Sequence, residues 1–302
     1  MDRREFIIAG AAAAAVAASP SLHSQEHTMK PVFKLKYAPH FGMFENSAGK
    51  DLLDQLQFAA DEGFRAWEDN GMMKRDKSLQ QKIADKMASL DMEMGVFCSY
   101  LGYGKKDMVS RTDKDFQDEL RKMSHDTVET AKRVNARWCT VVPSEVEMKL
   151  DYDYQMANCV ENLRVMAEIF EKTGLVMVLE PLNWQANHPG LFLTKMAQAY
   201  NICTAVDSPS CKILDDLYHQ QITEGNLIPN IDKCWKHIAY FQTGDNPGRK
   251  EPTTGEINYR NVFAHIHSKG YTGIVGMEHG NSRKGKDGER AVIEAYRKCD
   301  NF

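Results

Sequence analysis

Short apolar runs alternate with longer amphipathic segments from residue 33 to the C-terminus. The apolar runs are rich in β-branched and aromatic residues, which is typical of buried strands, and the longer segments repeat their apolar positions with the period of a helix. The runs predict strands at residues 33–38, 64–68, 94–99, 138–143, 175–180, 211–216, 237–242 and 272–278. The amphipathic segments predict helices at residues 50–61, 78–90, 113–134, 154–173, 192–206, 258–269 and 287–299, with helical turns up to residue 235.

Strict alternation of strands and helices indicates a parallel sheet. Eight strand–helix units are the number that closes a (β/α)8 TIM barrel, and residues 29–302 have a suitable length for one such domain. A doubly wound open sheet is the alternative. Residues 38–43, which follow the first strand, lack the glycine fingerprint of the dinucleotide-binding version of that fold. A polar segment at residues 100–112 is predicted to be a loop that forms a lid or a pocket wall.

The first 28 residues have a different composition. Arg3 and Arg4 precede Phe6, and residues 9–18 are almost all alanine. A basic start followed by a short, mildly apolar stretch is typical of a cleavable signal peptide, and the arginine pair resembles a twin-arginine signal. The alternative is a short alanine-rich helix. The stretch is too short to span a membrane, so the sequence predicts an exported, periplasmic bacterial protein without a stable membrane anchor.

Composition and charge exclude several classes of protein. The chain is 42% hydrophobic and 26% charged, which suits a globular domain, and its net charge of −4 without a long Lys/Arg cluster argues against nucleic-acid binding. The seven cysteines are scattered without a CxxC pair, so neither a disulfide framework nor a zinc ribbon is predicted.

The segment 176–184 places a charged side chain at the end of a predicted buried strand. Glu180 ends the apolar run, and Pro181, which lacks an N–H for the sheet, is expected to stop the strand there. A buried carboxylate is costly unless it is paired or binds a metal.

Other predicted strands also end in polar residues, and the C-terminal strand ends of a TIM barrel form the active-site face. These residues are His40, Glu68, Asp215, Asp216, Gln242 and Glu278. The strands that end at Glu180, Asp215–Asp216, Gln242 and Glu278 are consecutive. Together they supply three carboxylates and one amide oxygen to the same rim. Such a site suits Mg²⁺ or Mn²⁺ best and also admits Co²⁺ or Zn²⁺. The alternative is that each acid is a solvated loop residue or a helix cap.

Only one of the two adjacent aspartates can face the barrel axis, because side chains alternate along a strand. The apolar pattern does not choose between them. Asp216 lies one helical turn before His219, so these two side chains can face the same site if the chain turns helical there. Asp215 is then expected to cap that turn.

Longer motifs around these strand ends resemble the hydroxypyruvate isomerase family, one of the xylose-isomerase-like TIM barrels and a relative of the tagatose/psicose 3-epimerases. The motifs are Glu180-Pro-Leu-Asn183, Asp216-Leu-Tyr-His219, Gln242 with Asp245-Asn-Pro-Gly-Arg249, Thr254-Gly-Glu-Ile-Asn-Tyr259 and Gly276-Met-Glu278. The resemblance spans residues 33–300 and is strongest from 176 to 280. The export signal and the first half of the chain, including the loop 100–112, depart from the family pattern.

The resemblance implies a role for each matching residue. The residues that match the family's ligands to one divalent metal are Glu180, Asp216, Gln242 and Glu278. Glu180 and Glu278 would also move protons, and His219 and Arg249 would contact the substrate. His40 and Glu68 are weaker predictions for substrate contacts, since each is equally consistent with a satisfied polar group near the rim.

These roles predict a metal-dependent isomerase or epimerase of a small keto acid, such as hydroxypyruvate, or of a ketose. A divalent cation that holds a carbonyl and its neighbouring hydroxyl stabilises the enediolate formed by proton loss. Return of the proton to the adjacent carbon gives isomerisation, and return to the same carbon from the opposite face gives epimerisation. The alternatives are an exported carbohydrate-binding barrel without turnover and a metal-dependent endonuclease, although the histidine-rich site and basic face of the latter are absent from the sequence. Family analogy also suggests a homo-oligomer.

Overall fold

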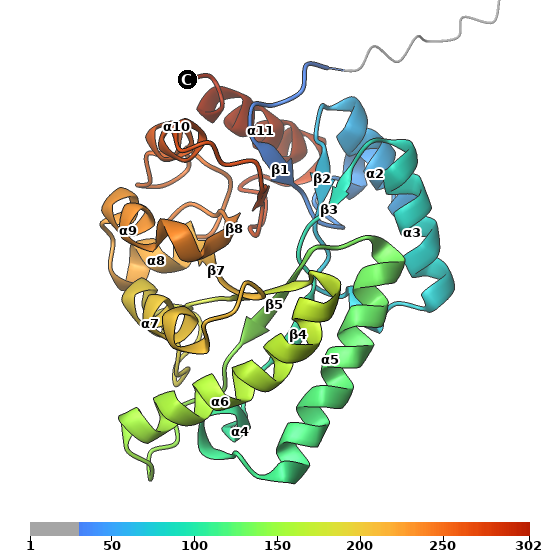
Figure 1. Cartoon of the computed structure of the whole chain (residues 1–302). Coiled ribbons are helices and arrows are strands. Elements are labelled where there is room, and N and C mark those ends of the chain that lie inside the picture. Colours follow the sequence, from blue (N-terminus) through green and yellow to red (C-terminus); the bar gives the residue numbers. More distant parts are fainter. Residues whose placement is uncertain (1–29) are drawn as a thin grey trace, which may run out of the picture.

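Nine short parallel strands form a seven-stranded sheet and a two-stranded sheet in the computed structural model, which describes residues 30–302. The strands are β1 (Lys36–Ala38), β2 (Ala66–Trp67), β3 (Glu93–Met94), β4 (Cys98–Leu101), β5 (Trp138–Val142), β6 (Val176–Leu179), β7 (Cys211–Asp216), β8 (Ile238–Gln242) and β9 (Ile274–Gly276). Seven of them pair in the order β1-β9-β8-β7-β6-β5-β4, and β2 pairs with β3. The sheet curls so that β1 meets β2 through a parallel bridge between His40 and Glu68. The result is a TIM-barrel-like α/β domain (Figure 1).

The interior of the curled sheet is filled by eight apolar side chains, seven from strands and one, Val96, from the segment between β3 and β4. These side chains are Ala38, Ala66, Val96, Trp138, Val178, Leu214, Tyr240 and Ile274. The two large rings, Trp138 and Tyr240, meet edge to face with their centroids 5.7 Å apart, and alanines contribute the small side chains of the layer. This packed layer is what a barrel of eight positions requires, because its interior is a core rather than a pore.

Helices cover the outside of the sheet. The longer ones are α2 (Leu52–Asp61), α3 (Lys77–Ser89), α5 (Lys114–Val134), α6 (Tyr152–Phe170), α7 (Met196–Val206), α10 (Tyr259–Ser268) and α11 (Gly285–Cys299). The shorter ones are α1 (Glu45–Ala48), α4 (Asp107–Ser110), α8 (Leu217–Thr223) and α9 (Leu227–Cys234), with 3-10 turns η1 (Met72–Lys74), η2 (Glu171–Thr173) and η3 (Trp235–His237). Helices α5 and α6 lie side by side outside β4 and β5 (Figure 1). The apolar faces of the helices and the outward residues of the strands form the main core.

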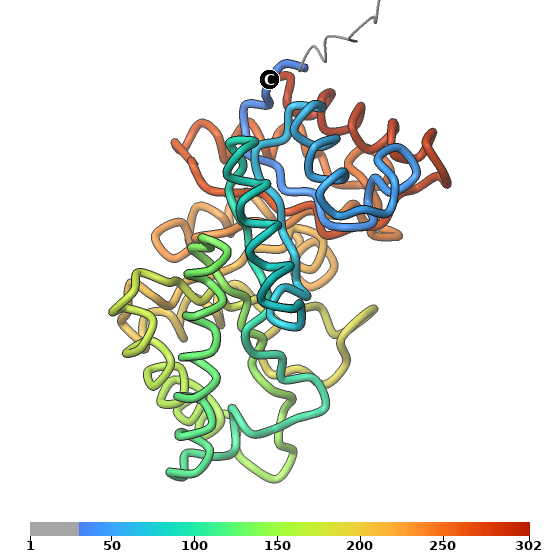
Figure 2. Tube along the Cα trace, turned by 90° about the vertical axis from the view of Figure 1, so that its right-hand side faces the viewer, coloured from blue at the N-terminus to red at the C-terminus, as the bar shows by residue number. Residues whose placement is uncertain are grey.

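The two ends of the described chain lie next to each other, on the same side of the domain (Figure 2). The backbone N–H of Lys34, just before β1, donates to the Asp300 carboxylate at 2.7 Å, and the Tyr37 hydroxyl donates to the same carboxylate at 3.0 Å. The C-terminal segment therefore fixes the first strand beside the last helix.

The predicted elements differ from the structure in the third unit of the barrel. The strand predicted at 94–99 is divided into β3 and β4, which are separated by Gly95–Phe97. The segment 100–112, predicted to be a loop, contains the end of β4 and the short helix α4. The predicted signal peptide at residues 1–28 lies outside the described residues. Within the described part, no helix has the length and apolar character needed to cross a membrane.

Candidate active site

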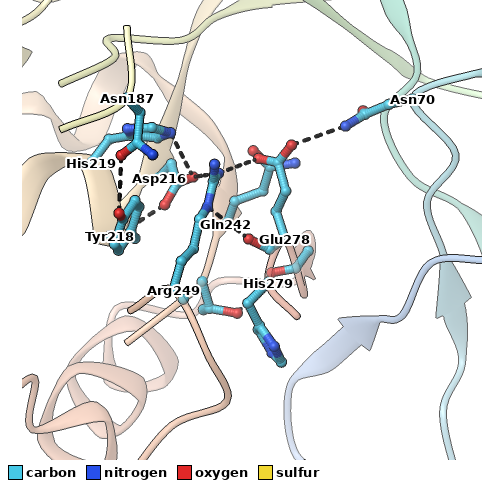
Figure 3. A network of polar contacts seen from close by, with 12 residues as sticks. Asn70, Asn187, Asp216, Tyr218, His219, Gln242, Arg249, Glu278 and His279 are labelled. Carbon is cyan, nitrogen blue, oxygen red and sulfur yellow. Dashed lines mark hydrogen bonds and ion pairs between the residues drawn. The ribbon is translucent and has the colours of Figure 1, made fainter. Parts of the chain in front are cut away.

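The polar strand ends predicted to converge do so at one rim of the sheet (Figure 3). Glu180 follows β6, Asp216 and Gln242 are the last residues of β7 and β8, and Glu278 lies two residues beyond β9. Asp216 and Gln242 are fully buried, Glu180 is 6% exposed, and the Glu278 side chain is half-buried. The C-terminal ends of four consecutive strands thus bring three carboxyl groups and one amide into a small, largely buried volume.

Arg249 lies between two of these carboxylates. Its Nη2 atom donates to Asp216 Oδ2 at 2.9 Å and to Glu278 Oε2 at 3.0 Å, and its Nε donates to the Glu278 carbonyl oxygen at 3.0 Å (Figure 3). Burial raises the pKa of both carboxyl groups, and the positive charge of Arg249 opposes that rise. Arg249 is therefore the counter-charge of the cluster among the described residues.

The loop after β8 holds Arg249 in this position. Asp245 accepts backbone hydrogen bonds from Gly255 at 2.8 Å and from Ile257 at 3.1 Å, and its carbonyl oxygen accepts from the Arg249 N–H at 2.9 Å. Arg249 has a positive φ of 51°, which is unusual for a residue with a side chain. The buried Asp245 carboxylate thus ties the two sides of the loop together behind the guanidinium.

Glu68 lies beneath Gln242 and contacts it directly. The Glu68 carboxyl group accepts from Tyr240 Oη at 3.1 Å and from Gln242 Nε2 at 3.3 and 3.4 Å. Gly276 permits this arrangement, because a Cβ atom there would lie 2.1 Å from Glu68 Oε2. Because the amide nitrogen of Gln242 donates to Glu68, the amide oxygen of Gln242 points away from Glu68. That atom, Oε1, is buried and has no hydrogen-bond partner among residues 30–302.

Glu180 differs from the other acids of the cluster in its hydrogen bonding. No hydrogen bond to its carboxylate is found in residues 30–302. Burial raises its pKa well above the ordinary value, and the negative charges of Glu278 and Asp216 raise it further. A carboxyl group with a raised pKa is suited to accept and return a proton near neutral pH.

The structure decides which of the two adjacent aspartates faces the cluster. Asp216 points to the rim, and its Oδ1 accepts from the Tyr218 N–H at 2.9 Å, so Asp216 caps helix α8. The expectation that Asp215 caps this turn is wrong. Asp215 lies on the opposite face of β7, where burial, followed by the charge of Asp216, raises its pKa to about 8. Its Oδ1 has no hydrogen-bond partner within the part of the chain that the structure describes.

His219 extends from α8 to the same cluster. Candidate ligand atoms of Glu180, Asp216 and His219 lie within 4.8 Å of one another. The His219 ring is fully buried, its Nε2 is 3.6 Å from Asp216 Oδ2, and burial followed by the charge of Arg249 lowers its pKa well below the ordinary value. The structure thus groups His219 with two of the four predicted metal ligands.

The weaker sequence predictions have defined contacts. The ring nitrogens of His40 face the carbonyl oxygens of Phe41 at 3.0 Å and His279 at 3.2 Å. Both His40 and Glu68 line a cavity of about 310 Å³ that also reaches Asn70 and Glu278.

Three further residues lie near the site. Asn70 and His188 were not predicted to take part in it, and Tyr103 belongs to the segment 100–112 that was predicted to form a lid or a pocket wall. Asn70 donates to Glu278 Oε1 at 3.0 Å (Figure 3). Tyr103 and His188 stack with ring centroids 5.2 Å apart, and the His188 ring centroid is 5.4 Å from that of His219. All three are on loops that follow strands of the barrel. Their position after a strand end could be recognised in the sequence. Their contacts with residues on other loops, far away in the sequence, could not be predicted from it.

The fold and the site agree with a family assignment. Residues 56–299 match the model of the xylose isomerase-like TIM barrel family, so the chain belongs to that family, as its motifs predict. A match of this extent covers the strands that carry every member of the acid cluster.

The chain is also similar to individual proteins and solved structures. The chain is 39% identical over 123 residues to hydroxypyruvate isomerase of Escherichia coli, a match that covers 41% of this chain and 47% of that protein. The chain thus spans about half the length of the curated relatives it matches. Among solved structures, it is similar to an AP endonuclease, family 2, from Brucella melitensis, with a TM-score of 0.73, 25% identity and coverage of 84% of this chain and 96% of that one. It shares its fold with 3-keto-D-glucoside 4-epimerase of E. coli, with a TM-score of 0.72, 18% identity and coverage of 89% and 100%.

Proposed function

We propose that the protein is a divalent-metal-dependent isomerase or epimerase of a small keto acid, such as hydroxypyruvate, or of a ketose. The proposed reaction moves a proton from a carbon next to a carbonyl group and passes through an enediolate. The observation that carries this proposal is the cluster of Glu180, Asp216 and Glu278 at adjacent strand ends, with the guanidinium of Arg249 bridging two of these acids. The relatives described above, which include a keto-acid isomerase and a sugar epimerase, support the same class of reaction.

The donor atoms fit a hard divalent metal. Among residues 30–302, the buried Gln242 Oε1 has no hydrogen-bond partner and the Glu180 carboxylate receives no hydrogen bond, and Arg249 forms ion pairs with Asp216 and Glu278 but not with Glu180. Oxygen donors of this kind suit Mg²⁺ or Mn²⁺, and Co²⁺ or Zn²⁺ are also compatible. We propose that the ligands are Glu180, Asp216, Gln242 and Glu278. When bound, such a metal supplies Lewis-acid polarisation of the substrate carbonyl.

The protein's own residues perform the proton transfer in this proposal. Glu180 and Glu278 project from β6 and β9, which are not neighbours in the sheet, so they approach the site from different sides. Glu180 lacks hydrogen bonds that would hold its charge, whereas Glu278 is fixed by Arg249 and Asn70. We therefore assign Glu180 as the base that removes the proton, because no hydrogen bond from residues 30–302 lowers its proton affinity. Glu278, which Arg249 and Asn70 hold in place, acts as the second proton-transfer group. Arg249 and His219 orient the substrate oxygens.

The test is carbon–hydrogen exchange. The metal-loaded protein is incubated in D₂O with hydroxypyruvate and a panel of ketoses, and deuterium uptake at carbon is followed by NMR. Uptake at the carbon next to the carbonyl group is expected for at least one substrate. Binding without uptake for every compound would contradict the proposal and favour a carbohydrate-binding barrel without turnover.

Glu68→Gln is expected to weaken metal binding without removing a ligand. In the structure the Glu68 carboxyl group accepts from Gln242 Nε2, whereas a glutamine at position 68 can turn its NH₂ group toward Gln242 and no longer fixes the orientation of the Gln242 amide. Loss of such a supporting contact typically costs about 10- to 100-fold in metal affinity. Calorimetric titration with Mn²⁺ measures the change.

Glu251→Gln is the matched control for this measurement. Glu251 is equally buried but accepts from the Ser282 N–H at 2.8 Å, away from the acid cluster. Unchanged metal affinity in Glu68→Gln, or an equal loss in both variants, would show that Glu68 does not orient Gln242.

We also propose that residues 1–28 direct export by the twin-arginine route, on the basis of Arg3 and Arg4 before the alanine-rich stretch. Replacing both arginines by lysine keeps the positive charge and is expected to hold the full-length protein inside the cell. Immunoblots of periplasmic and cytoplasmic fractions measure this. A periplasmic fraction that is unchanged in the double variant would exclude a twin-arginine signal.

A further inference from the structure

The side chain of His219 is surrounded by hydrogen-bond donors on one side. Its Nδ1 atom faces the side-chain Nδ2 of Asn183 at 2.7 Å and the backbone N–H of the same residue at 3.3 Å. The backbone N–H of Asn183 can only donate. The role of His219 Nδ1 therefore depends on which end of the Asn183 side-chain amide it meets.

The orientation of the Asn183 amide is fixed by its other contacts. Its Oδ1 accepts from the backbone N–H groups of Ala186 at 2.9 Å and Asn187 at 3.2 Å. Its Nδ2 donates to Asn187 Oδ1 at 2.9 Å as well as to the imidazole. All four hydrogen-bonding positions of this fully buried amide are therefore used. Rotating the amide by 180° would place its NH₂ group against two N–H donors and lose both contacts of the turn.

His219 Nδ1 must consequently accept two hydrogen bonds, so it carries no proton. A neutral imidazole with an unprotonated Nδ1 carries its proton on Nε2. This Nε2 atom is fully buried, and no hydrogen-bond partner is found for it among the described residues. It points toward Asp216 but remains 3.6 Å from its Oδ2 (Figure 3).

We propose that Asn183 is a positioning residue that fixes His219 in its Nε2–H tautomer, so that His219 donates a hydrogen bond to a substrate oxygen and does not bind the metal. The proximity of His219 to Glu180 and Asp216 would otherwise suggest a metal site of these three residues. A metal ligand needs a free lone pair, and the lone pair of Nε2 is used by the proton. The second half of this inference rests on the proposed function, whereas the tautomer does not.

A neutral N–H donor at this point has a defined chemical use. The substrate oxygen gains negative charge as the proton leaves carbon, and a donor that is already oriented stabilises that charge without reorganisation. The buried donor also favours a ligand with a carbonyl or hydroxyl oxygen over one with an apolar group at the same place, because an unmatched buried N–H is costly.

Nitrogen NMR of ¹⁵N-histidine-labelled protein tests the tautomer directly. The His219 signals are assigned by their loss in His219→Gln. In the wild-type protein, Nε2 is expected at the shift of a protonated nitrogen and Nδ1 at that of an unprotonated one, both without metal and after addition of Zn²⁺. The opposite pattern, or a change of Nε2 to a metal-bound shift with Zn²⁺, would overturn the inference. The wild-type spectrum decides this point whether or not any variant at Asn183 folds.

Asn183→Asp tests the role of Asn183. An aspartate keeps the oxygen that accepts from Ala186 and Asn187 but replaces the NH₂ donor by an acceptor, so His219 is expected to move its proton to Nδ1. Deuterium exchange should then fall by on the order of 10²- to 10⁴-fold, as for other lost donors and wrong tautomers. Asn187→Asp is the matched control, because it introduces the same charge one contact away from His219 and should leave the Nε2–H pattern intact.

The outcomes separate this inference from the proposed function. An Nε2–H signal in a protein that exchanges deuterium with none of the substrates would retain the tautomer and reject the isomerase. Active exchange with an Nδ1–H signal would retain the isomerase and reject the inference. A folded Asn183→Asp protein that keeps the Nε2–H pattern would show that Asn183 does not set the tautomer.

Discussion

Glu180→Gln is expected to abolish most deuterium exchange at the substrate carbon, with a loss of about 10²- to 10⁴-fold in rate. Glutamine keeps the size of the side chain and an oxygen toward the metal, but it cannot accept the proton. The Glu180 carboxylate receives no hydrogen bond from residues 30–302, and burial raises its pKa, so its proton affinity rather than its packing is the property removed. Single-turnover exchange in D₂O with the metal-loaded variant measures the effect.

Glu168→Gln is the control for this substitution. The Glu168→Gln substitution makes the same chemical change on the exposed face of α6. This variant is expected to exchange deuterium into the substrate at the wild-type rate. Exchange that survives in Glu180→Gln with metal still bound would remove Glu180 from the proton transfer and leave it only as a ligand.

Asp216→Asn is expected to lose the metal, whereas Asp215→Asn is expected to retain it. An asparagine at position 216 still accepts from the Tyr218 N–H and caps α8, but it no longer provides the negative oxygen that faces the cluster. Loss of a direct ligand should exceed the roughly 10- to 100-fold cost of a lost supporting contact. Asp215 faces away from the cluster, and its pKa of about 8 keeps it largely uncharged at pH 7, so a neutral amide changes little there.

Metal content after dialysis, measured by atomic emission, compares the two variants. Thermal unfolding of the metal-free proteins provides the control for folding. Metal retained in Asp216→Asn and lost in Asp215→Asn would reverse the assignment of the two aspartates.

The sequence was sufficient to predict which polar strand ends converge at one rim of the sheet. Each acid follows a short apolar run, and parallel strands bring their C-terminal ends to one rim, so the convergence of Glu180, Asp216, Gln242 and Glu278 follows from topology. It was not sufficient to divide the third strand into β3 and β4. The residues between them, Gly95–Phe97, continue the apolar pattern although the backbone leaves the sheet.

Side-chain partners were harder to predict than positions. Glu68 was a weaker prediction for a substrate contact, and the structure holds it against Gln242 and Tyr240, partners that are more than 170 residues away in the sequence. Asn183 was noted only as part of a family motif, because its contact with His219 depends on the turn that follows β6 and on the orientation of one amide. Hydrophobic periodicity carries no information about such contacts.

Arg249 has a consequence for the order in which the molecule is assembled. Its guanidinium group already bridges Asp216 and Glu278, so two of the buried acids have a positive partner as soon as the loop after β8 closes. We therefore expect folding to precede metal loading, with the ion acquired by a finished barrel rather than acting as its nucleus. Under the twin-arginine route and the metal site proposed above, the protein would leave its compartment of synthesis folded and take up its metal afterwards.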